Sequence, residues 1–397
     1  MSDVNIPEPD VSAEHPVSDH WIWVGPHRPP VPRVLHEHMT QNWAVDEIPS
    51  VVHPAATFTA ERRARLAETF PGKTLVIPTG GPKVRANDTD YRFRPGTDFF
   101  YLTACNEPDC VLVITPGAKG SRATLYIARR RNHETHEFYT DARYGELWVG
   151  VRRGVEEAAV YFGIDTAPLE YLAKDLSSLA ATDVVVLRGF DSMVDSLIEA
   201  HDADNDLAHT LSEMRLVKDD FEVAQLQVAI DATIRGFEDV VRALPVAVKR
   251  GERVIEGIFG LRARVEGNDV GYSTIAASGA NATVLHWIEN DGEVRDGDLL
   301  LLDAGIECDN LYTADVTRTL PINGRFTPAQ RALYELVREA HKAGIEAVAP
   351  GASFGAPHEA AMKVLAAGLF ELGILKVSPD EALRRDRQLH RRYTLHG

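Results

Sequence analysis

The sequence contains few cysteines and no long apolar run. Its 397 residues include only Cys105, Cys110 and Cys308, an odd number without C-x-x-C spacing. Neither a disulfide framework nor a structural zinc site is therefore indicated, and free thiols suit a reducing compartment. No apolar stretch approaches the length of a transmembrane helix, and the acidic, proline-bearing N-terminus has no signal-peptide core. We expect a cytoplasmic protein without a membrane partner.

An excess of basic charge is also missing. The formal net charge is -17, and no basic stripe dominates the sequence. Because contacts to phosphates need a basic face, we expect no nucleic-acid partner. The hydrophobic fraction of 44% and the charged fraction of 25% are those of a globular protein. The length favours about two domains.

The first half of the chain has the order of an α/β domain. Residues 1–55 contain many prolines and histidines without periodicity, and they predict an irregular arm. A first domain is expected over residues 56–212, where apolar runs separated by Gly, Pro and Asn predict strands and a helix lies between later runs. The expected strands are 74–78, 98–103, 110–115 and 123–128, and the expected helix is 154–163.

A second domain is expected over residues 213–397. Asp219 and Glu222 match a capping box, and apolar residues then recur at intervals of three and four, which predicts a long amphipathic helix. Thr327 and Gln330 begin a second helix in the same way. We expect both helices to cover a sheet with these apolar positions: Val223, Leu226, Ile230, Ile234, Phe237 and Val241 in the first, and Leu333, Leu336, Val337 and Ala340 in the second.

Two acids follow from a predicted hairpin in this domain. An apolar run over 299–302 ends at Asp303, a turn is expected at Asp309-Asn310, and strand character resumes over 311–320 with Asp315 on one face. Such a hairpin brings Asp303 and Asp315 side by side. Two carboxylates in a mostly buried site cannot both ionise unless a cation lies between them. Carboxylates with nearby histidines favour Mn, Zn, Co or Fe.

Three motifs in this region carry a family resemblance. His286-Trp287, Asp303-Ala304-Gly305 and the segment 315–319 resemble, in order and spacing, the metallopeptidases of the aminopeptidase P, prolidase and creatinase group. Residues 91–114 resemble the amino-terminal domain of aminopeptidase P. The resemblance implies a mixed α/β (α+β) chain, in which a smaller creatinase-like α/β domain precedes a catalytic domain of pita-bread fold.

The same resemblance implies an activity and a set of site residues. The expected reaction releases the N-terminal residue from a peptide with proline in second position, by attack of a metal-bound hydroxide. Asp303 and Asp315 match metal ligands of two divalent ions, for which we expect Mn²⁺, with Zn²⁺, Co²⁺ or Fe²⁺ as alternatives. His286 and His396 match catalytic histidines that hydrogen-bond the substrate. A proline-containing peptide is the expected partner, and a homodimer or homotetramer the expected assembly.

Alternatives remain at this point. One is a prolidase, which cleaves Xaa-Pro dipeptides, and another is a non-catalytic pita-bread protein that binds peptides; a creatinase is less favoured. His396-Gly397 matches the start of a segment in which a further His, and later two Glu residues, complete the metal shell of the family. We therefore expect the catalytic domain of residues 213–397 to be incomplete and these 397 residues alone to be inactive.

Overall fold

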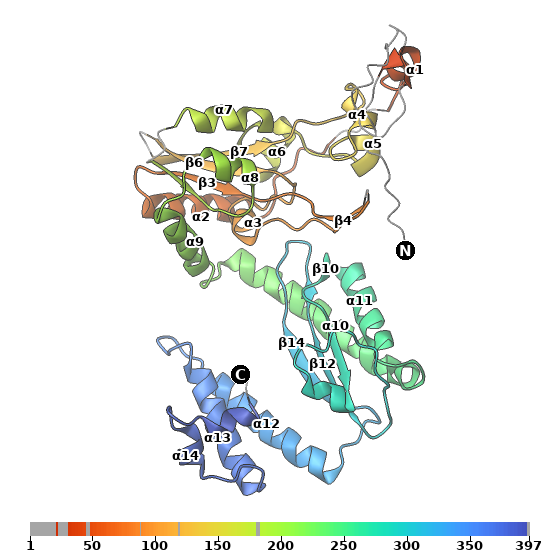
Figure 1. Cartoon of the computed structure of the whole chain (residues 1–397), viewed down its shortest axis with the longest axis vertical. Coiled ribbons are helices and arrows are strands. Elements are labelled where there is room, and N and C mark those ends of the chain that lie inside the picture. Colours follow the sequence, from red (N-terminus) through yellow and green to blue (C-terminus); the bar gives the residue numbers. More distant parts are fainter. Residues whose placement is uncertain are drawn as a thin grey trace, which may run out of the picture. The chain divides into compact units, whose positions relative to one another are not determined.

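The computed structural model describes residues 21–22, 31–44, 48–87, 89–117, 120–179 and 183–394 (Figure 1). Two compact units are present, of which the first ends at Val223 and the second begins at Ala224. The division falls near the start of helix α10, Asp220–Arg250. The boundaries expected from the sequence, at residues 55 and 212, stay predictions.

A mixed sheet forms the centre of the first unit. In its described part, five strands are ordered β8-β7-β6-β3-β9. β3 pairs antiparallel with β6 and parallel with β9, and β7 pairs parallel with β8. The strand predictions for 74–78, 110–115 and 123–128 are confirmed. The strands are β3 Thr74–Pro78, β6 Val111–Gly117, β7 Gly120–Ile127, β8 Asp165–Pro168 and β9 Val184–Val186.

Helices and short strands make up most of the remaining described part of the first unit. The helix expected over 154–163 is confirmed as α6, Val155–Phe162. Two short antiparallel pairs are β1 Trp21–Ile22 with β2 Val31–Pro32, and β4 Val84–Ala86 with β5 Thr89–Asp90. The other helices are α1 Arg33–His38, α2 Ala56–Thr69, α3 Thr97–Thr103, α4 Glu137–Thr140, α5 Glu146–Val149, η1 Leu169–Tyr171, α7 Leu172–Ser177, α8 Ser192–Leu197 and α9 Ala203–Met214.

One predicted strand is wrong. The run 98–103 lies in helix α3, which begins after Gly96, where the amide of Phe100 donates to the carbonyl of Gly96 at 3.0 Å. Phe99 to Thr103 are all buried, so apolar side chains surround the helix axis and no polar face interrupts the run. A short apolar run of this kind has no periodicity that separates a buried helix from a buried strand.

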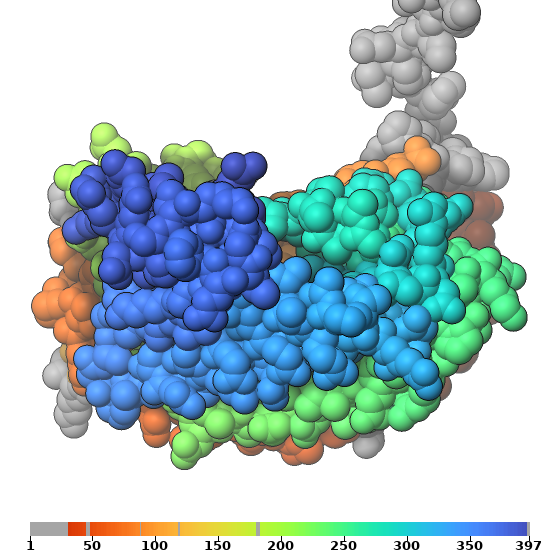
Figure 2. Space-filling view, turned by 90° about the horizontal axis from the view of Figure 1, so that it is seen from below, coloured from red at the N-terminus to blue at the C-terminus, as the bar shows by residue number. Residues whose placement is uncertain are grey.

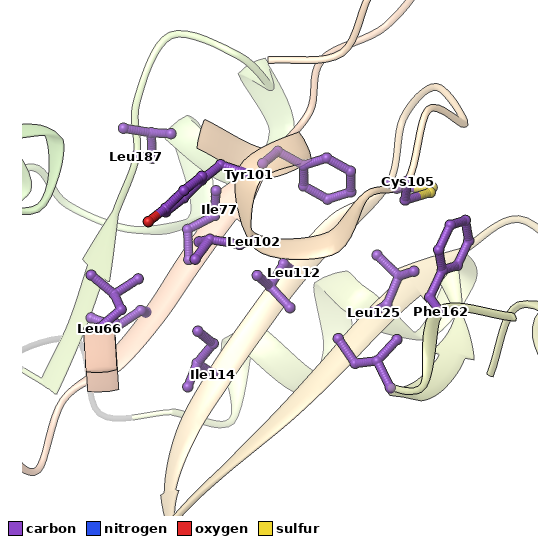
Figure 3. Close-up of a cluster of buried hydrophobic side chains, with 14 of the residues drawn as sticks. Leu66, Ile77, Tyr101, Leu102, Cys105, Leu112, Ile114, Leu125, Phe162 and Leu187 are labelled. Carbon is purple, nitrogen blue, oxygen red and sulfur yellow. The ribbon is translucent and has the colours of Figure 1, made fainter. Parts of the chain in front are cut away.

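Both faces of the sheet are buried. Along β3, Leu75 and Ile77 belong to one apolar cluster and Val76 to another, as the alternation of side chains in a strand requires. Helix side chains cover the first cluster, and Figure 3 shows Leu66 of α2 and Tyr101 of α3 on it. This double cover explains why the strands are continuous apolar runs in the sequence.

The second unit has a smaller antiparallel sheet in its described part, ordered β11-β12-β14. Its strands are β11 Ile275–Ser278, β12 Leu299–Ala304 and β14 Val316–Pro321. A separate pair joins β10 Asp269–Val270 to β13 Ile306–Glu307. Helix α11, Arg253–Glu266, and α10 pack on this sheet through a cluster that includes Phe259, Ala276, Leu300 and Leu302.

Helix α10 begins as predicted, although it buries a different face. The amide of Asp219 donates to Glu222, and the amide of Glu222 to Asp219, each at 3.0 Å, so the capping box is confirmed. The predicted apolar stripe is largely exposed at Val223, Ile234 and Val241. Small side chains allow the helix to approach the sheet closely, and the α10 residues buried in the cluster on this sheet are Ala232, Val240, Leu244 and Ala247.

Residues after β14 form a group of helices. α12 Pro328–Glu346 begins at the expected capping box of Thr327 and Gln330. It packs against α13 Ala356–Glu371. Leu336, which we expected to face the sheet, packs instead in an apolar cluster with residues of α13 and of α14, Pro379–Leu383. η4 Leu389–Arg392 follows α14, and in Figure 2 the residues after β14 form the blue part of the surface.

None of the helices in the described ranges combines the length and apolar character needed to span a bilayer.

Candidate metal centre

Asp303 and Asp315 lie at the same end of two paired strands. β12 and β14 are antiparallel, with Asp303 opposite Thr317 and Ala304 opposite Val316. Asp315 directly precedes β14, so the strand expected over 311–320 begins later than predicted. The chain reverses before it, at the predicted turn, where Leu311 has φ +62° and donates its amide to the carbonyl of Cys308 at 2.8 Å.

A glycine allows the two acid-bearing segments to approach. A Cβ placed on Gly305 would lie 1.6 Å from the carbonyl oxygen of Ala314. Gly305 therefore cannot carry a side chain unless the segment before Asp315 moves away from the segment after Asp303. Gly271 also has no room for a side chain, because its Cβ would lie 2.0 Å from Cγ2 of Thr313 in the segment before Asp315.

The hydroxyl of Tyr272 joins the two carboxylates. It lies 2.6 Å from Oδ1 of Asp303 and 3.1 Å from Oδ1 of Asp315, so one phenol contacts both acids. Burial, followed by the hydrogen bond and charge of Asp303 and the charge of Asp315, raises the pKa of Tyr272 well above its usual value. The hydroxyl therefore stays protonated and donates to the carboxylates, which reduces their mutual repulsion.

The carboxylates fit a hard divalent cation in part. Asp303 is half-buried and Asp315 is exposed, so the site is more open than the mostly buried one expected. One oxygen of each accepts from the same Tyr272 hydroxyl, so the two carboxylates lie close together, and carboxylates suit Mn²⁺ and related ions. Across the described ranges, no group of three or more His, Cys, Asp or Glu side chains is placed to hold a metal ion. The described side chains thus supply two carboxylate ligands.

One of the two expected catalytic histidines lies among the described residues. His286 is exposed and lies in the long connection between β11 and β12, after the short helix η3, Gly279–Thr283. Its role in catalysis stays a prediction. His396 lies outside the described residues.

The sequence did not single out Tyr272. A tyrosine follows Gly271 within the motif-bearing region, yet a lone aromatic residue gives no signal for contact with acids 31 and 43 positions away. The pairing of β11 with β12, which places Ile275 opposite Asp303, brings this part of the chain to the acids. Only that pairing identifies Tyr272 as part of the site.

Comparisons with known proteins match both units. Residues 224–397 match metallopeptidase family M24, and residues 59–186 match the aminopeptidase P N-terminal domain. Xaa-Pro aminopeptidase 1 of Streptomyces coelicolor is 46% identical over 396 residues, which cover 99% of this chain and 79% of the relative. Xaa-Pro aminopeptidase of Haemophilus influenzae is 33% identical, over 85% of this chain and 77% of its own length.

Solved structures have the same fold. Zn-substituted Escherichia coli aminopeptidase P in complex with product superimposes with a TM-score of 0.74 at 29% identity, over 87% of this chain and 80% of that one. Aminopeptidase PepP of Pseudomonas aeruginosa gives a TM-score of 0.72 at 31% identity, over 85% and 77% of the two chains. The expected two-part fold, with a pita-bread domain second, is confirmed. The chain belongs to metallopeptidase family M24 and carries the amino-terminal domain of aminopeptidase P.

Proposed function

We infer that this protein is a metal-dependent Xaa-Pro aminopeptidase, which releases the N-terminal residue from peptides with proline in second position. The relatives at 46% and 44% identity are named Xaa-Pro aminopeptidases. The observation that carries the proposal is the convergence of Asp303 and Asp315 on the Tyr272 hydroxyl, within the segment that matches family M24. Prolidase, the alternative left open by the sequence, is not favoured by these relatives.

Asp303 and Asp315 would be two of the ligands that hold two divalent ions, and we propose Mn²⁺. Divalent ions at such a site supply Lewis acidity to the scissile carbonyl and activate water for attack. Tyr272 would orient both carboxylates through its hydroxyl. His286 and His396 would donate hydrogen bonds to the substrate oxygen that gains charge, which lowers the barrier without binding metal.

The proposal extends to the substrate and the assembly. An Xaa-Pro bond has no N–H and restricts the backbone, so the substrate is a peptide whose second residue presents a rigid ring. We propose that the protein forms a homodimer or homotetramer in the cytoplasm. The free thiols Cys105, Cys110 and Cys308 support a reducing location.

A comparison of peptide lengths tests the proposed activity. The natural full-length protein, supplied with Mn²⁺, should hydrolyse an Xaa-Pro-Xaa tripeptide and leave an Xaa-Pro dipeptide largely intact. Asp303→Asn should abolish the activity, whereas the matched change Asp309→Asn, at an exposed turn residue, should preserve it. Preference for the dipeptide would favour a prolidase, and failure to cleave either would favour a peptide-binding protein.

A further inference from the structure

Glu252 is a buried carboxylate outside the acid pair. It directly precedes α11 and is 0% exposed. Its Oε1 accepts from the amide of Ser278 at 2.7 Å and from Nδ2 of Asn281 at 3.0 Å. Its Oε2 accepts from Nε1 of Trp287 and from the amide of Gly292, both at 2.8 Å. Both carboxylate oxygens are therefore occupied by donors from a single connection, residues 278–292.

Such an arrangement suits a side chain that only accepts hydrogen bonds. Four N–H groups point at Glu252, and each of its two oxygens accepts two of them. An amide at this position would turn an NH₂ group toward some of these donors and leave buried polar groups unpaired. The site thus requires a carboxylate, and the shape of the connection depends on it.

Glu252 and Gly292 exchange hydrogen bonds in both directions. The amide of Glu252 donates to the carbonyl of Gly292 at 3.0 Å, while Gly292 donates back to the Glu252 side chain. A Cβ on Gly292 would lie 2.2 Å from Nδ2 of Asn281. A side chain at this position would therefore displace the Asn281 amide or the Glu252 carboxylate.

A second buried side chain, that of Asn290, holds the connection beside β11. Asn290 is 0% exposed, and its Oδ1 accepts from the amide of Ala276 at 2.8 Å. Its Nδ2 donates to the carbonyl of Thr274 at 2.9 Å. Asn290 therefore bonds on both sides of Ile275, the residue paired with Asp303. Its own φ of +47° favours asparagine over most residues.

We propose that Glu252 and Asn290 are positioning residues for His286. Glu252 holds the indole of Trp287, the residue directly after His286, and Asn290 fixes the segment four residues later beside the strand partner of Asp303. Together they set where the exposed His286 side chain stands relative to the acid pair. The inference rests on the proposed function, since it gives His286 its task in peptide hydrolysis.

The connection itself can be tested without activity. Glu252→Gln keeps the size of the side chain, and Trp287→Phe removes one of the four donors while retaining an aromatic ring. In Glu252→Gln, amide hydrogen exchange of residues 278–292 should accelerate and the emission of Trp287 should change, while exchange in α12 stays the same. The control Glu293→Gln alters an exposed acid close by and should change neither. Unchanged exchange in Glu252→Gln overturns the proposal.

A kinetic cycle tests the link to His286. In the natural full-length protein with Mn²⁺, Glu252→Gln and Asn290→Asp should each lower kcat/KM for the tripeptide by about 100-fold, as expected for a misplaced catalytic group, with bound metal unchanged. Trp287→Phe should give a smaller loss of the same kind. In a His286→Ala background the further loss from Glu252→Gln should fall below about 3-fold, because the two residues act as a unit.

The outcomes separate the two proposals. Full additivity with His286→Ala, or a loss of metal in Glu252→Gln, overturns the positioning role while the aminopeptidase activity stands. If the parent protein cleaves no Xaa-Pro peptide, the proposed function fails, and the exchange experiment alone then decides whether Glu252 holds the connection.

Discussion

At the scale of single residues, Tyr272 is the group that joins the two acids of the proposed metal site. Two carboxylates near each other repel, and the protonated phenol between Asp303 and Asp315 offsets that repulsion before any ion binds. A half-buried acid and an exposed one could otherwise turn toward water. The tyrosine thus keeps the oxygens in an arrangement that a cation can use.

The change Tyr272→Phe tests this role. Without the hydroxyl the carboxylates lose their common donor, and we expect metal affinity to fall by about 10-fold to 100-fold, as for other groups that orient metal ligands. Competition with a fluorescent chelator would measure it. Tyr334→Phe, on α12 against Phe326, is the matched control and should leave affinity unchanged. Equal affinities for Tyr272→Phe and the parent protein would remove Tyr272 from the site.

His286→Ala tests a role of a different kind. A side chain that donates only to the substrate should, when removed, lower kcat/KM by about 100-fold to 1000-fold and leave the metal content intact. Steady-state kinetics and elemental analysis on the same preparation would give both values. A parallel loss of metal would identify His286 as a ligand instead.

Buried thiols give a prediction about reactivity. Cys105, Cys110 and Cys308 are each at most 2% exposed, and burial raises the pKa of Cys110 and of Cys308. Because the thiolate is the reactive form, native protein should react slowly with a disulfide reagent at mildly alkaline pH, and all three thiols should react after unfolding. Fast labelling of native Cys110 would contradict the buried environment described for it.

At the scale of elements, the reversal between β12 and β14 depends on Gly305. Strand pairing alone places Asp303 opposite Thr317, one residue beyond the start of β14. The extra approach that brings Asp315 to the Tyr272 hydroxyl needs the space left by the missing Cβ of Gly305. Backbone packing therefore determines the site geometry as much as the ligands do.

Gly305→Ala should disrupt this approach. A Cβ at 1.6 Å from the Ala314 carbonyl forces the backbone apart, and we expect a loss of about 1–3 kcal/mol in the free energy of unfolding together with weaker metal binding. Gly257→Ala in α11 is the control, since nothing lies within 4 Å of its Cβ and alanine favours a helix by about 0.8 kcal/mol. Denaturant unfolding would compare them. Equal stability in both variants would mean that the reversal tolerates a side chain.

The helices show where sequence patterns stop being informative. Capping boxes at Asp219 and Thr327 were predicted correctly, because they depend on side chains only three residues apart. The buried face of α10 and the helix over Thr97–Thr103 were not, because both depend on what packs against them. Alanines at the α10 contact matter through their small size, which a search for large apolar residues overlooks.

At the scale of the whole molecule, the order of the motifs predicted the fold and the family better than any single element. Two acids, a histidine and an amino-terminal block in family order pointed to the two-part fold, and the matches over 59–186 and 224–397 confirm it. Tyr272, Glu252 and Asn290 were not found, because each acts through partners brought together by strand pairing. Residues of the metal-ligand type form a motif that can be recognised in the sequence, whereas the residues that position them do not.

Metal content in the acid variants shows whether Asp303 and Asp315 bind the ions that peptide hydrolysis needs. After dialysis against Mn²⁺, elemental analysis of the natural full-length protein should find about two ions per chain. Asp303→Asn and Asp315→Asn should each remove most of that metal, while Asp309→Asn retains it. We expect tripeptide hydrolysis to disappear with the metal. Full metal content in both Asp303→Asn and Asp315→Asn would contradict it.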